Sequence, residues 1–430
     1  MTNMVKVLLI SYGLRVRCYT GFILRGEIET PVQVVGVVEP NEFRRNWAKK
    51  DFNIPDDKCF ASLDEALKVE KFADCAINGT MDQLHYETTL PLLEKGYHVL
   101  LEKPVTSDET ELLKLKEAAD KNNVHLMICH LLRYTPFYGT MKKLILDGKL
   151  GEIMSIMASE NVAIMHSSSA FIRGKWRKQS ECGSTLLMAK CCHDLDYLCW
   201  LNNATKPKYV SSFGGRDFLI EKKAPEGAGT RCLVDCKCED KCHWSAYKDY
   251  INNSDWCYYA FETVDRPLEE ITKEERIEML KTDNYHGVCA YKSDSDLVDH
   301  QIVSIKFENG SVATLAMTTG AFRPGRDIHI LGTKGEIQGY LESSKFVYRE
   351  YDEVGGYYKE TEYDFNNENG INYGHMGGDG RLVEDFLKIV SGQAPSIAYT
   401  AIEDSINGHL CVYAADEAME KNQVVKVESV

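Results

Sequence analysis

The sequence predicts an α/β domain with a doubly wound parallel sheet, followed by an α+β domain with an open, mainly antiparallel sheet. One observation is the length of 430 residues, since a single core seldom grows beyond about 250 to 300 residues. The others are apolar runs that alternate with helical periods at the start of the chain and strands in succession after residue 150. We expect the first domain over residues 1–130 and the second over 131–430.

Five short apolar runs in the first domain lack alternating polar positions, which indicates strands that are covered on both faces. Helical periods separate them, as in residues 84–96 and 108–123. Strands that alternate with helices form a parallel sheet, because a right-handed crossover through a helix returns the chain to the same edge. The predicted strands are residues 5–11, 32–39, 73–80, 98–103 and 124–130.

In the second domain the expected strands follow one another, apart from a long insertion over residues 216–298. Asn309-Gly310, inside the segment 300–320, is a hairpin turn signal. Two amphipathic helical segments, 378–393 and 399–423, come late, so helices and strands are grouped as in an α+β domain. The predicted strands are residues 152–165, 207–215, 300–320, 326–342, 345–352 and 424–429.

The composition excludes several classes of partner. A formal net charge of -15 argues against nucleic acids and anionic membranes, because both need a basic surface. No segment reaches the roughly 18 unbroken apolar residues of a transmembrane helix. The first apolar run breaks at Tyr12-Gly13 and therefore fits a strand better than a signal peptide. We expect a cytoplasmic protein that binds neither nucleic acid nor a membrane.

The turn after the first predicted strand is a degenerate form of a dinucleotide-binding turn. In the frame G-x-G-x-x-G the three positions are Ser11, Gly13 and Val16. Only the central glycine, which lets the backbone approach a pyrophosphate, is present. By itself the match fits an ordinary strand-to-helix connection equally well.

An acidic residue after the second predicted strand strengthens the dinucleotide interpretation. Glu39 lies about 25 residues beyond the turn, where a carboxylate can accept hydrogen bonds from the ribose hydroxyls. A carboxylate also repels a 2′-phosphate. NAD is therefore the expected cofactor and NADP is disfavoured, although Arg44-Arg45 follows closely.

Further motifs occur along nearly the whole chain, and Glu102-Lys103-Pro104 after the fourth predicted strand is the most specific of them. The others are Arg15, Glu39-Pro40, Thr80, His85, Arg133-Tyr134, His193, Asp196 and the GTKGE sequence at 332–336. In this order they resemble the Gfo/Idh/MocA family of NAD(P)-dependent sugar and polyol oxidoreductases.

The resemblance implies a Rossmann domain and an open sheet that covers the nicotinamide and the sugar with one face. It also implies a homodimer or homotetramer through the other face, and a small carbohydrate or glycoside as the substrate. The cofactor-binding residues that it implies are Ser11, Gly13, Leu14, Arg15, Glu39, Thr80, His85 and Glu102.

Lys103 and His193 are the expected catalytic pair. Oxidation of a secondary alcohol transfers a hydride to nicotinamide while a base takes the hydroxyl proton. In the family, the lysine of Glu-Lys-Pro and the histidine of a D-x-x-x-H motif hold this hydroxyl. His193 matches the histidine, but Ala189 stands where the aspartate is expected. Lys190 lies on nearly the same helical face as His193, so either it replaces the aspartate as a catalytic, substrate-orienting group or it is a solvated helix residue.

Polar and aromatic residues elsewhere are candidates for substrate binding. The segment 169–177 resembles a loop of the family that clamps sugars, and an aromatic ring beside a guanidinium suits the mixed faces of a carbohydrate. Each candidate alone is as readily a turn or a hydrogen-bonded core residue. The candidates are Arg133, Tyr134, Arg173, Trp176, Asp194, His300 and His375.

The missing aspartate leaves three functions open. The first is NAD-dependent oxidation of a secondary hydroxyl of a sugar, polyol or glycoside. The second follows related branches that oxidise a sugar transiently, eliminate at the neighbouring carbon and reduce again, which gives a glycosidase-like reaction without net use of NAD. The third is a non-catalytic NAD-dependent sugar sensor, against which the presence of Lys103 and His193 argues.

The insertion contains a cluster of cysteines with the spacing C-x₃-C-x-C-x₃-C. A zinc ion bound by four thiolates would order an insertion that lacks a core of its own. The alternatives are reduced thiols that pack as small apolar residues, and a disulfide, which a cytoplasmic location disfavours. The candidate zinc ligands are Cys232, Cys236, Cys238, Cys242 and, by the resemblance, Cys289.

Overall fold

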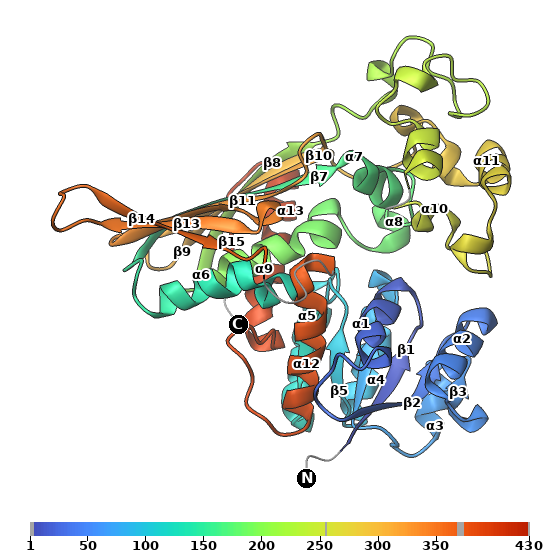
Figure 1. The fold of residues 1–430 in the computed structure, drawn as a ribbon, viewed down its shortest axis with the longest axis horizontal. Helices are drawn as coiled ribbons and strands as arrows, with labels where there is room; N and C mark the ends of the chain where they lie inside the picture. The colour runs from blue at the N-terminus through green and yellow to red at the C-terminus, as the bar shows by residue number, and fades with distance from the viewer. Residues whose placement is uncertain (1–3, 254–255, 368–373, 429–430) are drawn as a thin grey trace.

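Two sheets form the framework of the protein in the computed structural model, which describes residues 4–253, 256–367 and 374–428. Figure 1 shows the parallel sheet below the larger one, with the insertion at the upper right. The parallel sheet has six strands in the order β3-β2-β1-β4-β5-β6, and the larger sheet has nine. The predicted fold class, a Rossmann sheet followed by an open, mainly antiparallel sheet, is confirmed.

The predicted strands of the first sheet are present, and each ends one or more residues earlier than predicted. Glu39 and Lys103 lie beyond their strands because they turn away from the sheet at its carboxyl edge. The strand β3 was not predicted, since two residues carry no periodicity. The strands are β1 (Val5–Ile10), β2 (Val32–Val38), β3 (Cys59–Phe60), β4 (Cys75–Asn78), β5 (His98–Leu101) and β6 (Leu126–Ile128). The helices around them are α1 (Leu14–Leu24), α2 (Glu42–Phe52), α3 (Leu63–Lys68), α4 (His85–Glu94), α5 (Glu109–Asn122) and α6 (Pro136–Leu146).

The larger sheet is mixed, in the order β14-β13-β12-β11-β7-β10-β9-β8-β15. The Asn309-Gly310 turn joins β9 to β10 as predicted, whereas the segment 326–342 forms two strands, β11 and β12. Its strands are β7 (Ile153–Ala163), β8 (Pro207–Gly215), β9 (His300–Phe307), β10 (Val312–Ala321), β11 (Gly325–Gly332), β12 (Gly335–Tyr340), β13 (Lys345–Tyr351), β14 (Tyr358–Asp364) and β15 (Val425–Lys426). The helices α7 (Ile164–His166), α8 (Gln179–Cys182) and α9 (Cys192–Leu201) connect β7 to β8.

The C-terminal part of the chain returns to the first sheet. The helix α12 (Gly378–Val390) packs beside α1 because Gly380 leaves room: a Cβ there would lie 2.8 Å from the Phe22 ring. Before α13 (Ile402–Lys421), Thr400 accepts a hydrogen bond of 2.9 Å from the backbone nitrogen of Ile128 on β6. The edge of the Rossmann sheet is thus completed by residues from the end of the chain.

The insertion between β8 and β9 has an apolar core of its own, which includes Cys232, Tyr250, Cys257 and Phe261. The expectation that it lacks a core is therefore wrong. Its helices are α10 (Tyr258–Phe261) and α11 (Lys273–Lys281), drawn in yellow above α1 and α2 in Figure 1.

Among the helices that the structure describes, none combines the length and the apolar character needed to cross a membrane.

Candidate active site

A cavity of about 520 Å³ lies between the carboxyl ends of the Rossmann strands and the insertion. This volume falls within the usual range for ligand sites, roughly 300 to 1,000 Å³. The strand order reverses between β1 and β4, and such a crevice is where open α/β sheets bind ligands. The wall formed by the Rossmann domain includes Ser11, Gly13, Leu14, Arg15, Arg17, Arg44, Trp47, Gly79, Thr80, Asp82, Glu102 and Lys103.

The turn after β1 approaches β4 closely even though valine replaces the third glycine of the motif. A Cβ at Gly79 would lie 2.5 Å from Cγ2 of Val16. Gly79 therefore provides the space that a glycine at position 16 would otherwise provide. The sequence signal for this exchange is the glycine directly after the β4 strand.

Glu39 closes the turn rather than facing the cavity. Its side chain is 1% exposed, and it accepts hydrogen bonds from the backbone nitrogens of Tyr12 (2.8 Å) and Asn41 (2.9 Å). Arg44 pairs with it at 3.0 Å and itself lines the cavity. The acidic residue and the cation that would compete over a 2′-phosphate are therefore in direct contact.

Two arginines in the cavity wall have room for an anionic ligand. The Nε atoms of Arg17 and Arg44 are buried and have no hydrogen-bond partner among the residues that the structure describes. Burial lowers the pKa of Arg17, and its guanidinium lies 4.4 Å from the centre of the Trp47 ring. A buried, unpaired guanidinium nitrogen is costly, and a phosphate oxygen is a suitable acceptor for it. The residues present therefore fit a dinucleotide, and they would hold its phosphate groups.

Arg15 links the first domain to the C-terminal helix α12. Its Nε lies 2.8 Å from Oε1 of Glu102, and its Nη2 lies 2.6 Å from Oδ1 of Asp379. His375 approaches the other oxygen of Asp379 at 2.8 Å. Burial alone would raise the pKa of Asp379, but Arg15 and His375 outweigh it and hold that pKa well below its usual range. His375 thus belongs to the ion pairs behind the cofactor groove.

Lys103 points from the end of β5 toward the helix that carries His193. Its Nζ donates a hydrogen bond of 2.6 Å to the carbonyl oxygen of Ala189, the residue at the expected aspartate position. Burial opposes the charged form of Lys103, but its neighbours, Cys192, Glu102 and Asp82 among them, raise its pKa above the ordinary value. Lys103 is therefore an ammonium ion at neutral pH, in contact with the cavity.

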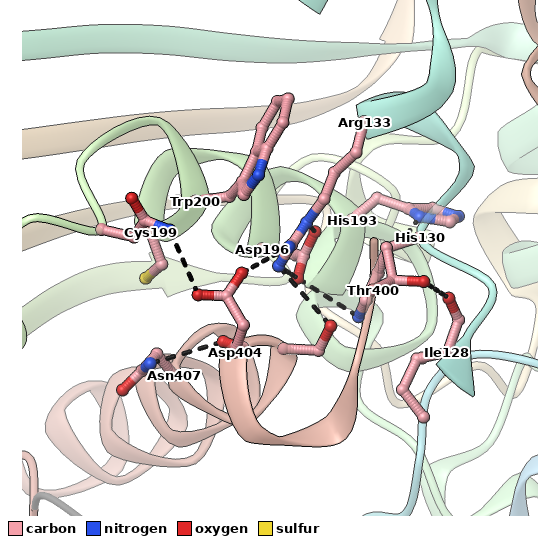
Figure 2. Close-up of polar contacts among 12 residues, drawn as sticks. Ile128, His130, Arg133, His193, Asp196, Cys199, Trp200, Thr400, Asp404 and Asn407 are labelled. Atoms are coloured by element: carbon pink, nitrogen blue, oxygen red, sulfur yellow. Dashed lines mark hydrogen bonds and ion pairs between the residues drawn. The ribbon is translucent and has the colours of Figure 1, made fainter. Parts of the chain in front are cut away.

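His193 is buried at the start of α9, directly after a π-helical turn over Leu187–Cys191. Its Nδ1 lies 3.5 Å from Nδ1 of His130, and Nε2 of His130 lies 3.7 Å from Oδ1 of Asp196 (Figure 2). Burial, followed by the charge of Lys103, lowers the pKa of His193 well below its ordinary value. His193 is therefore a neutral imidazole at pH 7. It stands behind the residues that line the cavity.

Lys190 and Asp194 belong to a chain of ion pairs on the sheet side of α9. Nζ of Lys190 lies 3.0 Å from Glu160 on β7, and Arg326 on β11 bridges Glu160 (2.7 Å) and Asp194 (2.7 Å). Asp194 is completely buried. The structure thus pairs both predicted residues with partners outside the cavity, and they hold α9 against the sheet.

Arg133 and Tyr134 connect the two domains instead of lining the cavity. Figure 2 shows the Arg133 side chain between α9 and α13. It contacts both oxygens of Asp196 (2.7 and 2.6 Å) and also Asp404. The hydroxyl of Tyr134 donates to Asp385 on α12 at 2.8 Å.

The other predicted site residues are divided between the cavity and its supports. Trp176 lines the cavity, and its Nε1 donates to Asp82 at 3.1 Å. His85 is buried, and its ring nitrogens lie 2.6 Å from the carbonyl oxygen of Pro104 and 3.1 Å from that of Thr80, so it fixes both loops.

Arg173 and His300 support the insertion. Arg173 is buried and donates hydrogen bonds to the carbonyl oxygens of Val288 (2.7 Å) and Trp244 (2.6 Å). His300 lies 2.7 Å from Asp299 at the base of the insertion.

Residues that the sequence reasoning missed form an aromatic face over the cavity. The ring of His166 stacks on Trp256 with 4.0 Å between centroids, and Trp256 stacks on Tyr259 at 5.9 Å. Tyr258 and Tyr259 line the cavity together with Trp176. The signal that could have revealed this face is the aromatic sequence WCYYAF at 256–261.

The predicted zinc site is not assembled. Across residues 4–253, 256–367 and 374–428, no group of three or more His, Cys, Asp or Glu side chains could hold a metal ion. Cys232 is buried in the core of the insertion, and Nη2 of Arg173 lies 3.5 Å from its sulfur, where a cation would be repelled. Cys236 and Cys238 approach each other at 3.7 Å between sulfurs. The remaining candidates, Cys242 and Cys289, are free thiols as well.

Comparison with known proteins extends over both domains. A family model described as "Oxidoreductase family, NAD-binding Rossmann fold" matches residues 17–130, and one described as "Oxidoreductase family, C-terminal alpha/beta domain" matches residues 142–427. Together they cover most of the chain.

Curated proteins and solved structures are similar at lower identity. The putative oxidoreductase YteT of Bacillus subtilis (strain 168) is 25% identical over 397 residues, 87% of either chain. The scyllo-inositol 2-dehydrogenase (NADP(+)) IolW of the same organism is 28% identical over 192 residues, 45% of this chain and 50% of the relative. The structure of levoglucosan dehydrogenase in complex with NADH has a TM-score of 0.70 at 17% identity and covers 100% of both chains, which shows a common fold.

Proposed function

Because this chain belongs to the Gfo/Idh/MocA oxidoreductase family, we propose that it binds NAD in the cavity and oxidises a secondary hydroxyl of a sugar, polyol or glycoside by hydride transfer. The observation that carries the proposal is Lys103, a buried ammonium ion at the carboxyl end of β5, which reaches the carbonyl of Ala189 on the helical turn before His193. The similarity to a scyllo-inositol dehydrogenase supports a ring polyol or sugar as the substrate class.

The two catalytic residues have different protonation states, and this assigns their roles. Lys103 is protonated and can donate a hydrogen bond to the substrate oxygen, which also stabilises the alkoxide that develops there. His193 is neutral and can accept the hydroxyl proton. Groups whose environments move their pKa values apart commonly divide the acid and base roles in this way. NAD, when bound, supplies the hydride acceptor.

His130 and Asp196 take the positioning role for which the family uses an aspartate. His130 touches His193 on one side and approaches Asp196 on the other. In hydrolase triads a carboxylate behind a histidine holds the correct tautomer and ring orientation. The pair would do the same here, with Arg133 fixing Asp196.

NAD is favoured over NADP by Glu39, whose charge stands at the ribose end of the groove. Arg44 offsets part of that charge at 3.0 Å. The preference is therefore a difference in affinity and not an exclusion.

The oxidation, elimination and reduction of a glycoside with NAD recycled in place is the second candidate. The specific observation in its favour is Ala189, which leaves the reaction site without the aspartate of the simple dehydrogenases. The polar site around Lys103 and His193 supports catalysis over a sensor that lacks it.

One experiment separates these functions. The purified protein is incubated with NAD and a panel of inositols, sugars and aryl glycosides while NADH absorbance and products are measured. Net oxidation predicts a stoichiometric rise of NADH with a keto product. Recycling predicts cleaved glycoside at constant NADH, and a sensor predicts ligand binding with neither product.

The outer face of the larger sheet supports the proposed homodimer or homotetramer. Apolar side chains on it are exposed, among them Met154, Met157, Phe213 and Ile302. Exposed apolar patches of this kind mark contact surfaces, and sedimentation of the purified protein measures the oligomeric state directly.

A further inference from the structure

We infer that residues 256–269 of the insertion, called the strap below, form the outer wall of the dinucleotide site and slow the release of the cofactor. This inference rests on the proposed NAD site and extends it to a part of the chain outside both halves of the family fold. The strap supplies nine of the residues that line the cavity: Tyr258, Tyr259, Phe261, Glu262, Val264, Asp265, Arg266, Pro267 and Leu268.

The two ends of the strap lie at the two ends of the groove. Tyr258 and Tyr259 line the same cavity as Arg15 and Lys103, where the reaction takes place. At the other end, Oδ1 of Asp265 accepts a hydrogen bond of 3.0 Å from Nδ2 of Asn41, which caps α2 next to Glu39. The strap therefore runs from the nicotinamide side to the ribose side of the adenosine.

The ribose end of the strap carries apolar side chains that face aromatic ones. Pro267 and Leu268 line the cavity together with Phe43 and Trp47 of α2. An adenine ring is planar and apolar on both faces, so a slot of this composition suits it.

The middle of the strap is held by ionic and aromatic contacts with the segment after β7. Glu262 lies 3.2 Å from Nζ of Lys175, and the ring of Tyr259 meets Trp176 edge to face with 5.9 Å between centroids. The other side of the strap is anchored in the core of the insertion by Phe261, which is 2% exposed. The strap is thus supported by a folded body and not by its own loop alone.

Enclosure of this kind changes kinetics more than it changes contacts. A dinucleotide with the Rossmann wall on one side and the strap on the other can leave only after the strap moves away, and such opening often limits product release. The contacts that must break are the exposed ones, Asp265 to Asn41 and Glu262 to Lys175.

The charge of these two acids makes the test discriminating. NAD and NADH are anions, so removal of nearby carboxylates would by charge alone strengthen their binding. The strap predicts the opposite, because Asp265→Ala and Glu262→Ala remove its two clasps. A faster release from the double variant can therefore not arise from electrostatics.

The experiment measures NADH dissociation from the full-length protein by displacement with excess NAD, followed through energy transfer from Trp47 and Trp176 in the cavity wall. The double variant Asp265→Ala/Glu262→Ala should release NADH about tenfold faster. The matched control is Glu274→Ala on the exposed side of α11, which removes one carboxylate outside the cavity and should leave the rate within twofold. Hydrogen exchange of peptides that cover the strap should slow when NADH is added.

The possible failures are distinguishable. An unchanged rate in the double variant together with unchanged exchange of the strap would overturn the inference while the NAD site stands. If the parent protein binds neither NADH nor NADPH, the proposed function fails and the inference fails with it.

Discussion

The imidazoles of His130 and His193 touch through their Nδ1 atoms, 3.5 Å apart, although 63 positions separate them in the sequence. Only one of two contacting nitrogens can donate, so the tautomer of one ring sets that of the other. The position of Asp196, 3.7 Å from Nε2 of His130, favours a proton on that nitrogen. The Nδ1 of His130 is then the acceptor, and His193 presents its unprotonated Nε2 as a base.

Replacement of His130 should impair catalysis without impairing binding. We expect His130→Ala to lower kcat about 10- to 100-fold, the usual effect of removing a partner that orients a histidine, with KM within about threefold. His130→Gln, whose side-chain amide can hydrogen-bond to His193, should recover part of kcat. A purely structural role would lower Tm and change kcat and KM together, with no recovery by glutamine.

Replacement of His193 removes the base itself. We expect His193→Asn to lower kcat about 10²- to 10⁴-fold, while the Kd for NADH, measured by fluorescence, stays unchanged. Because the pKa of His193 is lowered below 6.5 and that of Lys103 is raised above 10.5, the base is unprotonated and the acid protonated throughout the neutral range. The parent kcat should be level from about pH 7 to 9.5 and fall only in acid. A maximum with a limb near pH 8 would contradict this assignment.

Replacement of Lys103 tests the ammonium group. We expect Lys103→Met to lower kcat/KM at least about 100-fold, since it deletes a charged donor in a water-poor site. Lys114→Met, on the exposed face of α5, is the matched control and should retain full activity. Equal kcat/KM in both variants would remove Lys103 from the reaction.

Replacement of Arg44 should alter the choice of cofactor. Its Nε is buried without a partner in the described part of the chain, and the side chain lines the cavity, so a 2′-phosphate would use it. We expect Arg44→Ala to raise the Kd for NADPH about tenfold and that for NADH less than threefold. The control is Arg45→Ala, because Arg45 binds the carbonyl oxygens of Glu39 and Pro40 and does not line the cavity. A parallel loss of NADH and NADPH binding would show that Arg44 does not read the 2′ position.

Replacement of Asp416 on α13 should stabilise the protein in a pH-dependent way. Burial raises the pKa of Asp416 from 3.8 to about 6, so the folded state binds a proton more tightly than the unfolded state. Stability is then lost as the pH rises from about 4 to 6, and the whole cost persists above pH 6. Asp416→Asn keeps the acceptor for Thr185 (2.7 Å) and offers a donor to the unpaired Oε1 of Gln301.

We expect the free energy of unfolding of the Asp416→Asn variant to exceed that of the parent by about 1 to 3 kcal/mol at pH 8. The difference should vanish below about pH 4. Denaturant titrations at both pH values measure it, and a gain that is equal at both would rule out the proton-linked cause.

The elements of the fold could be predicted because periodicity is a local property. The strands of the Rossmann sheet and the hairpin at Asn309-Gly310 follow from runs of a few residues. The motif residues Gly13 and Lys103 could be placed at the cavity for the same reason, since the carboxyl ends of parallel strands converge.

The partners of buried charges could not be predicted, because they come from distant segments. Asp194 and Arg133 resemble ligand-binding residues in the sequence, yet Arg326 and Asp196 neutralise them at positions far along the chain. The π-helical turn before His193 also changes the helical phase, so the expected face of Lys190 could not be derived from α-helical spacing. The strap had no motif at all, and only its packing over α2 reveals it.

The pairing of β6 with Thr400 has a consequence for synthesis on the ribosome. Ile128 emerges roughly 270 residues before its partner, and at 5 to 20 residues per second this delay lasts about 10 to 50 s. During that time the nascent nucleotide-binding half has an open edge and lacks the counter-ion that Asp379 gives to Arg15. The first half of the polypeptide is thus a natural client for chaperones until translation terminates.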